Sequence, residues 1–258
     1  AIGRESGRFN QGSYSVALGH IAGMCNQGSY CVAVGLGAGK VSQGNNATAV
    51  GNSAGFSNQG AQSVAVGQAA GTTSQGFQSI AIGDTAGGDR QQAYGLAVGV
   101  AAGTTTQGVA GVAIGYISGN ANQRCYSVAV GAESGRYNQL QYATAIGPYA
   151  GLQSQNSFAI AVGPDTGRHN QGQFSVAMGY GAGYVNQATN SVTIGYNSGK
   201  YNQETVAVAV GVGAGETTQR GGAVAVGYLA GYNNQQADAT AVGRHAGQVT
   251  QGTNAAAM

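Results

Sequence analysis

The sequence predicts an all-β fold, a parallel β-solenoid (β-roll) of sixteen coils with two short strands in each coil. Glycine occupies every sixteenth residue from Gly3 to Gly243, and a second glycine column runs in the same step from Gly7 to Gly247. A glutamine column keeps this period from Gln11 to Gln251. A period this strict indicates one short structural unit stacked on copies of itself.

The first strand of each coil is predicted from alternating side chains. With Ala1 as position one, position sixteen is β-branched or leucine in nearly every coil, position one is small, and position two is always Ile, Val, Leu or Met. This alternation is typical of a strand, which we expect over about positions fourteen to two. The glycines at positions three and seven should bracket a tight turn; representative structural turn glycines are Gly3, Gly7, Gly67, Gly71, Gly131, Gly135, Gly243 and Gly247.

A second, shorter strand is expected over about positions eight to eleven, ending on the glutamine column. A loop that often starts with glycine, as at Gly12 and Gly28, then returns the chain. Stacked amides can donate to one coil and accept from another. The predicted structural glutamine ladder is Gln11, Gln27, Gln43, Gln59, Gln75, Gln91, Gln107, Gln123, Gln139, Gln155, Gln171, Gln187, Gln203, Gln219, Gln235 and Gln251.

Two registers of the first strand are possible. We favour the one that places the small residues of positions fifteen, one and six inside, because Val and Ile pairs would overfill so thin a coil. Val and Ile then form two outward ladders that need burial, and a closed ring of two or three chains would supply it. The subunit-interface candidates are Val16, Leu18, Val64, Val66, Val128, Val130, Val192 and Ile194. The opposite register would permit a monomer.

No shift in composition interrupts the repeat, so we predict a single β-solenoid domain over residues 1–258. Because the chain starts and ends in mid-coil, we expect it to be a segment of a longer fibre. Charged residues make up 7% of the chain and the net charge is +2, which argues against a nucleic-acid partner. No apolar run reaches the ~20 residues that span a bilayer, so we expect no membrane insertion in this segment.

Residues that could carry chemistry do not converge. A repeat places like residues in columns, whereas catalysis needs unlike residues at one place. His20, His169 and His245 lie in different coils and are expected to be solvated turn residues. Gly35-Leu36-Gly37 and Gly179-Tyr180-Gly181 lack the third glycine of a phosphate-binding loop. We therefore predict no catalytic, metal or cofactor site, and a protein that is not an enzyme.

Three local patterns have a structural interpretation. Cys25 and Cys31 flank one turn, so they either pair across it or Cys31 stands in for a small interior residue. The acid and arginine of Glu133-Ser134-Gly135-Arg136 span the tight turn and are expected to pair, as are those of the equivalent segments 5–8 and 165–168. Asn46-Ala47-Thr48 is one weak glycosylation sequon.

Aromatic residues recur at position fourteen (Tyr14, Tyr30, Tyr94, Tyr126, Tyr142, Phe158 and Phe174) and at position four (Tyr116, Tyr180, Tyr196 and Tyr228). They could stack on glycans or seal the edge between neighbouring chains, and we favour the seal. Threonine runs such as Thr104-Thr105-Thr106 occur in separated coils, which argues against an ice-binding array.

The strand and turn from Ser127-Val128-Ala129-Val130-Gly131 through Ser134-Gly135 resemble the head repeats of trimeric autotransporter adhesins (YadA-like), and similar repeats occur in fibre proteins of phages and giant viruses. The resemblance covers the whole chain. It implies a left-handed β-roll, a homotrimer and display on a cell or virion surface. This coil is slightly longer than that of the adhesins, and its glutamine column is unbroken.

These observations favour a structural extracellular or virion-surface fibre or filament whose partner is itself, as a homotrimer or in end-to-end filaments. The alternative is an adhesin head that binds a host receptor or glycan through variable turn residues.

Overall fold

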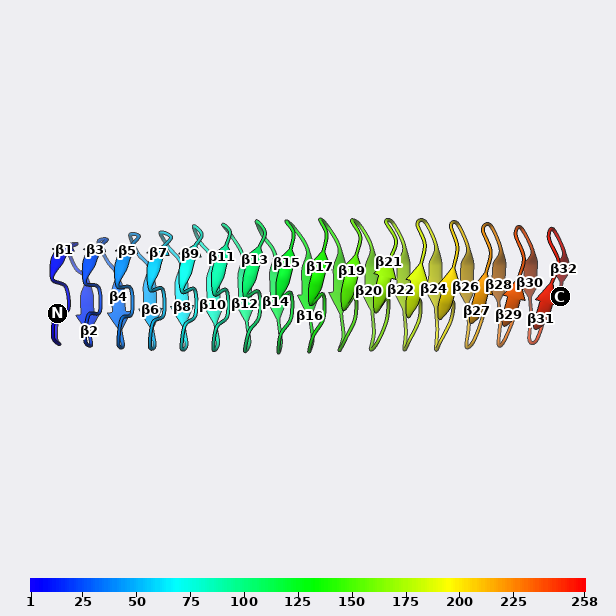
Figure 1. The fold of residues 1–258 in the computed structure, drawn as a ribbon, viewed down its shortest axis with the longest axis horizontal. Helices are drawn as coiled ribbons and strands as arrows, with labels where there is room; N and C mark the ends of the chain where they lie inside the picture. Colours follow the sequence, from blue (N-terminus) through cyan, green and yellow to red (C-terminus); the bar gives the residue numbers. More distant parts are fainter. The chain divides into compact units, whose positions relative to one another are not determined.

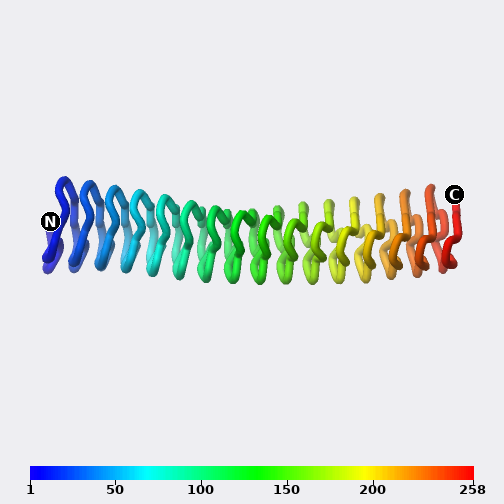
Figure 2. The backbone as a smooth tube through the Cα atoms, turned by 90° about the horizontal axis from the view of Figure 1, so that it is seen from above, coloured from blue at the N-terminus to red at the C-terminus, as the bar shows by residue number.

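The computed structural model describes residues 1–258 and contains strands and turns but no helix. The chain divides into two compact units, Ala1–Ser127 and Val128–Met258. In each unit the coils stack so that equivalent strands lie side by side (Figures 1 and 2). The chain is thus a parallel β-solenoid of about sixteen coils, as the repeat predicts.

The strands of the first unit form two parallel sheets. One sheet contains β1 (Phe9–Gln11), β3 (Cys25–Gln27), β5 (Val41–Gln43), β7 (Ser57–Gln59), β9 (Thr73–Gln75), β11 (Asp89–Gln91), β13 (Thr105–Gln107) and β15 (Ala121–Gln123). The other contains β2 (Val16–Leu18), β4 (Val32–Val34), β6 (Thr48–Val50), β8 (Val64–Val66), β10 (Ile80–Ile82), β12 (Leu96–Val98) and β14 (Val112–Ile114).

The second unit repeats this arrangement. Its even-numbered strands are β16 (Val128–Val130), β18 (Thr144–Ile146), β20 (Ile160–Val162), β22 (Val176–Met178), β24 (Val192–Ile194), β26 (Val208–Val210), β28 (Val224–Val226), β30 (Thr240–Val242) and β32 (Ala256–Ala257). Its odd-numbered strands are β17 (Tyr137–Gln139), β19 (Gln153–Gln155), β21 (His169–Gln171), β23 (Val185–Gln187), β25 (Tyr201–Gln203), β27 (Thr217–Gln219), β29 (Asn233–Gln235) and β31 (Val249–Gln251).

Strand register follows the sequence period. Val16 pairs with Val32, Ala17 with Ala33 and Leu18 with Val34, so each residue lies beside its own equivalent in the next coil. We call the face formed by the even-numbered strands the even face and that formed by the odd-numbered strands the odd face.

The strands are shorter than the sequence pattern predicts. The predicted spans of positions fourteen to two and eight to eleven shrink to positions sixteen to two and nine to eleven. Position fourteen is in the left-handed region, with φ of 59° at Tyr14 and 60° at Tyr30, and this conformation ends the extended run. Asn10 and its equivalents also have positive φ, which bends each odd-numbered strand in its middle.

The interior of both units consists of small side chains. Except in the two end coils, Ala17, Ala33 and their equivalents at position one are fully or almost fully buried, as are Ala22 and Ala38 at position six. Val and Ile on either side of position one are half-buried or exposed. The structure therefore has the favoured register, with small residues inside and branched residues outside.

Candidate assembly surface and turn sites

The buried glutamines connect the two walls of each coil. The Nε2 of Gln43 donates to the carbonyl oxygens of Val32 at 3.0 Å and Ala47 at 3.1 Å. Gln107 does the same to Leu96 and Gly111, both at 2.9 Å. The Ala47 and Gly111 carbonyls also accept a backbone N–H from the neighbouring coil, from Val32 at 3.0 Å and from Leu96 at 2.9 Å. Each glutamine therefore adds a second donor to a paired carbonyl and finds partners for its own buried amide, which would cost free energy without them.

Contacts between glutamines are less continuous than a uniform ladder. Nε2 of Gln27 donates to Oε1 of Gln43 at 3.1 Å, and Nε2 of Gln91 donates to Oε1 of Gln107 at 2.9 Å. Six buried Oε1 atoms of the column lack a donor: those of Gln27, Gln59, Gln75, Gln91, Gln187 and Gln203. The backbone carbonyls are therefore the more regular partners of the column.

The two columns require glycine for different steric reasons. A methyl group on Gly67 would lie 2.6 Å from the carbonyl oxygen of Gly83, so the first column allows neighbouring coils to approach. A methyl group on Gly71 would lie 2.7 Å from Oε1 of Gln75, so the second column makes room for the glutamine. The second glycine column and the glutamine column thus depend on each other.

The even face carries the interface candidates, and it is apolar. Val64, Val66, Val128, Val130 and Val192 are partly exposed. Val16 is 50%, Leu18 42% and Ile194 39% exposed. The sheet register stacks these side chains on their own equivalents, which gives two apolar columns along the even face of each unit.

An aromatic column borders the even face at position fourteen. The rings of Tyr14 and Tyr30 stack with centroids 5.1 Å apart, and those of Tyr142 and Phe158 at 4.9 Å. Phe158 in turn stacks on Phe174 at 5.1 Å. These rings are exposed, with Tyr14 at 81%, and they widen the apolar surface on one side.

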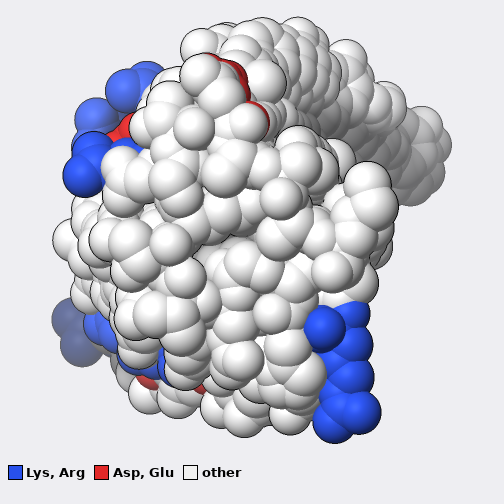
Figure 3. Space-filling view, turned by 90° about the vertical axis from the view of Figure 1, so that its right-hand side faces the viewer, with Lys and Arg blue, Asp and Glu red and all other residues white.

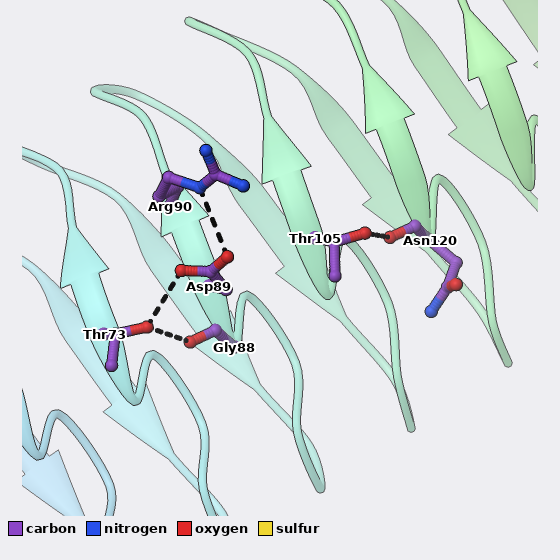
Figure 4. Close-up of polar contacts among 6 residues, drawn as sticks. All are labelled: Thr73, Gly88, Asp89, Arg90, Thr105 and Asn120. Atoms are coloured by element: carbon purple, nitrogen blue, oxygen red, sulfur yellow. Dashed lines mark hydrogen bonds and ion pairs between the residues drawn. The ribbon is translucent and has the colours of Figure 1, made fainter.

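The odd face is largely polar, and its side chains bond to one another from coil to coil. Thr73 Oγ1 lies 3.1 Å from both the Gly88 carbonyl oxygen and Asp89 Oδ1, and the Asp89 carboxylate also pairs with Arg90 at 3.2 Å (Figure 4). In the same view Thr105 donates to the Asn120 carbonyl at 3.0 Å.

Position ten carries a column rich in asparagine that was not predicted from the sequence, and its left-handed backbone suits Asn. Asn170, Asn186 and Asn202 bond in series on the odd face, at 3.1 Å each. The signal was the recurrence of Asn, Ser and Thr at this position in fifteen of the sixteen coils.

The predicted acid–arginine pairs are present at all three turns. Arg136 pairs with Glu133 and Arg168 with Asp165, both at 2.7 Å, and Arg8 lies 3.4 Å from Glu5. Such pairs contribute about 0–1 kcal/mol each, so they stabilise the turns only slightly.

Viewed from the end that carries the C-terminus, charged atoms appear at only a few places on the surface (Figure 3).

The cysteines are free thiols, so Cys25 and Cys31 do not pair. Cys31 points inward and donates to the Gly44 carbonyl at 2.9 Å, whereas Cys25 is partly exposed on β3. Burial raises the pKa of the Cys31 thiol, so it stays protonated at neutral pH.

The histidines do not come together. His20 and His245 are exposed turn residues, as expected. His169 instead lies on β21, where burial and Arg168 lower its pKa. No three His, Cys, Asp or Glu side chains are grouped to hold a metal ion. The structure also has no helix of the length and apolarity that crossing a membrane requires.

Comparison of the chain with protein-family models and with curated proteins gives no match.

Proposed function

We propose that the chain is a structural rather than catalytic protein, which forms an extracellular, cell-surface or virion-surface fibre by association with copies of itself. The observation that carries this proposal is the exposure of two apolar columns on the even face of both units. Burying a half-exposed Val or Ile contributes about 1 kcal/mol, and the repeat supplies many such residues.

A second copy is the occupant that fits this face best. Its own columns have the same coil-to-coil spacing, so branched side chains meet branched side chains along the whole contact. Few charges need to be desolvated, because the chain has 10 basic and 8 acidic residues in 258. The resemblance to trimeric adhesin heads favours a homotrimer with left-handed coils, in which three even faces close around one axis.

The test is solution mass by multi-angle light scattering. Ile146 and Ile160 on the even face are 41% and 37% exposed, so the double variant Ile146→Lys, Ile160→Lys should fold and yet disfavour association. We expect three chain masses for the unsubstituted protein and a shift toward one for this variant. Gln153→Lys, which adds a charge on the exposed odd face, is the control and should keep three. A monomeric unsubstituted protein would refute the proposal.

Recognition of a host receptor or glycan by variable turn residues is the second candidate function. An aromatic hollow over the turns of the second unit favours it.

A further inference from the structure

A hollow of about 210 Å³ opens over the turns that follow β20, β22 and β24. Its volume is below the roughly 300–1,000 Å³ of pockets for drug-sized ligands, and suits one sugar ring rather than a larger molecule. It lies on turn positions four to nine, away from the Val and Ile columns of the even face.

Gly181 lines the hollow. It occupies position five, where other coils carry side chains as large as Ile117, Tyr149 and Leu229. The flanking coils place Asp165 and Asn197 at this position, and a Cβ on Gly181 would lie 2.5 Å from Asn197 Oδ1, so the missing side chain makes room for the Asn197 amide beside the hollow. Gly181 has φ of 62°, the same left-handed conformation that the larger residues adopt there.

Tyr180, Tyr184 and Tyr201 form the walls. Tyr180 stacks on Tyr196 with ring centroids 5.3 Å apart, and Tyr184 meets Tyr201 edge-on at 6.3 Å. The Tyr184 hydroxyl accepts a hydrogen bond from Arg168 at 3.1 Å, so this ring is held in place. Rigid aromatic faces of this kind bind the C–H faces of pyranose rings at little entropic cost.

The polar groups favour an anion. Arg168 neutralises Asp165 at 2.7 Å. The Lys200 Nζ lies 5.1 Å from the centroid of the Tyr201 ring, makes no direct ion pair and interacts with the Glu216 carboxylate only at longer range. Asn197 Oδ1 is buried without a hydrogen-bond donor. Asn197 lines the hollow, so a turn of its amide would bring this buried, unpaired oxygen to a ligand hydroxyl.

We propose that this hollow binds a pyranose residue that carries a carboxylate, with the ring against the tyrosines, the carboxylate on Lys200 and a hydroxyl on Asn197. The proposal deepens the recognition function above, and every contact comes from one chain.

The test is saturation-transfer difference NMR with methyl α-glycosides of N-acetylneuraminic acid and glucuronic acid, using methyl α-glucoside as the neutral control. We expect at least one acidic glycoside to bind, and at least tenfold weaker binding of the neutral one. Gly181→Leu fills the hollow with a residue that position five tolerates at Leu229, and it should abolish binding. Gly37→Leu makes the same change at position five outside the hollow and should leave binding unchanged.

Two further variants keep the backbone intact. Tyr184→Ala should abolish binding, and Lys200→Gln should weaken the acidic glycoside at least tenfold and bring it close to the neutral one. Absence of binding by both acidic glycosides overturns the site. Binding that survives in both Gly181→Leu and Tyr184→Ala also overturns this site, but leaves recognition elsewhere on the chain. Equal binding of the neutral glycoside overturns the carboxylate assignment.

Discussion

At the scale of single residues, the interior glutamines make hydrogen bonds that an apolar side chain could not make. Each coil is too thin for a core of large side chains, and its interior alanines bury little apolar area. The amide of Gln123 reaches across this interior, donating to Val112 at 2.8 Å and Ser127 at 3.3 Å and accepting from Gln107 at 3.1 Å. Stability therefore depends on buried hydrogen bonds more than is usual in a globular domain.

Gln123→Ala should lower the free energy of unfolding by about 3 kcal/mol, because it removes two buried hydrogen bonds that Gln123 donates, takes an acceptor from the Gln107 amide and opens a cavity. Arg124→Ala changes an exposed neighbour and should stay within about 0.5 kcal/mol of the unsubstituted protein. Thermal unfolding followed by circular dichroism compares the two. Equal midpoints would contradict a structural role for the glutamine column.

At the scale of the coil, stacking requires two kinds of unusual backbone. Gly67 has φ of 129°, a region that is essentially closed to other residues. Ala69, two residues later, has φ of 53°, which costs a non-glycine residue only about 1–2 kcal/mol. One turn therefore contains one position where glycine is obligatory and one where it is optional.

Gly67→Ala should destabilise the protein by about 3 kcal/mol or more, since the added methyl group also meets the Gly83 backbone. The reverse exchange, Ala69→Gly, should change stability by less than about 1 kcal/mol, because relief of strain offsets the entropy of glycine. Chemical denaturation of both variants measures the difference. A mild effect at Gly67 would mean that neighbouring coils can move apart.

At the scale of the coil, the repeat also limits where different kinds of side chain can form a binding or catalytic site. Each column repeats one residue type, so unlike groups meet only where the repeat varies. The hollow at Gly181 is such a place, and its residues come from three successive coils. In the sequence, Gly179-Tyr180-Gly181 partly matches a phosphate-binding loop but lacks its third glycine. Its significance lies instead in the side chain that Gly181 lacks.

At the scale of the whole molecule, the two sheets face different environments. The odd face bonds to itself from coil to coil, whereas the even face leaves branched side chains exposed. An apolar ladder of this kind is better buried than solvated, and association with identical chains supplies the burial.

Association also makes apparent stability depend on protein concentration. We expect the thermal midpoint of the unsubstituted protein to rise over a hundredfold increase in concentration. The double variant Ile146→Lys, Ile160→Lys should show a much smaller rise. Calorimetry at several concentrations makes the comparison, and a midpoint that is constant for both proteins would argue against assembly.

The sequence by itself determined the repeat and the two-strand coil, and it favoured, without deciding it, the register that places small residues inside. It could determine them because identical coils repeat each local preference sixteen times, and one period fixes the pairing of each residue with its equivalent in the next coil. Which face of the strand points inward was decided by the structure, where the alanines are buried. Strand ends were predicted too long, since nothing in the varied residues at position fourteen announces a left-handed backbone.

Only the tertiary structure decided what the varied residues do. Cys25 and Cys31 are six residues apart, but Cys25 is partly exposed whereas Cys31 is buried inside the coil. Tyr184 and Tyr201 are seventeen residues apart, and their rings meet because stacking brings neighbouring coils together. Contacts of this kind depend on which residues stacking places side by side, and a column pattern does not specify them.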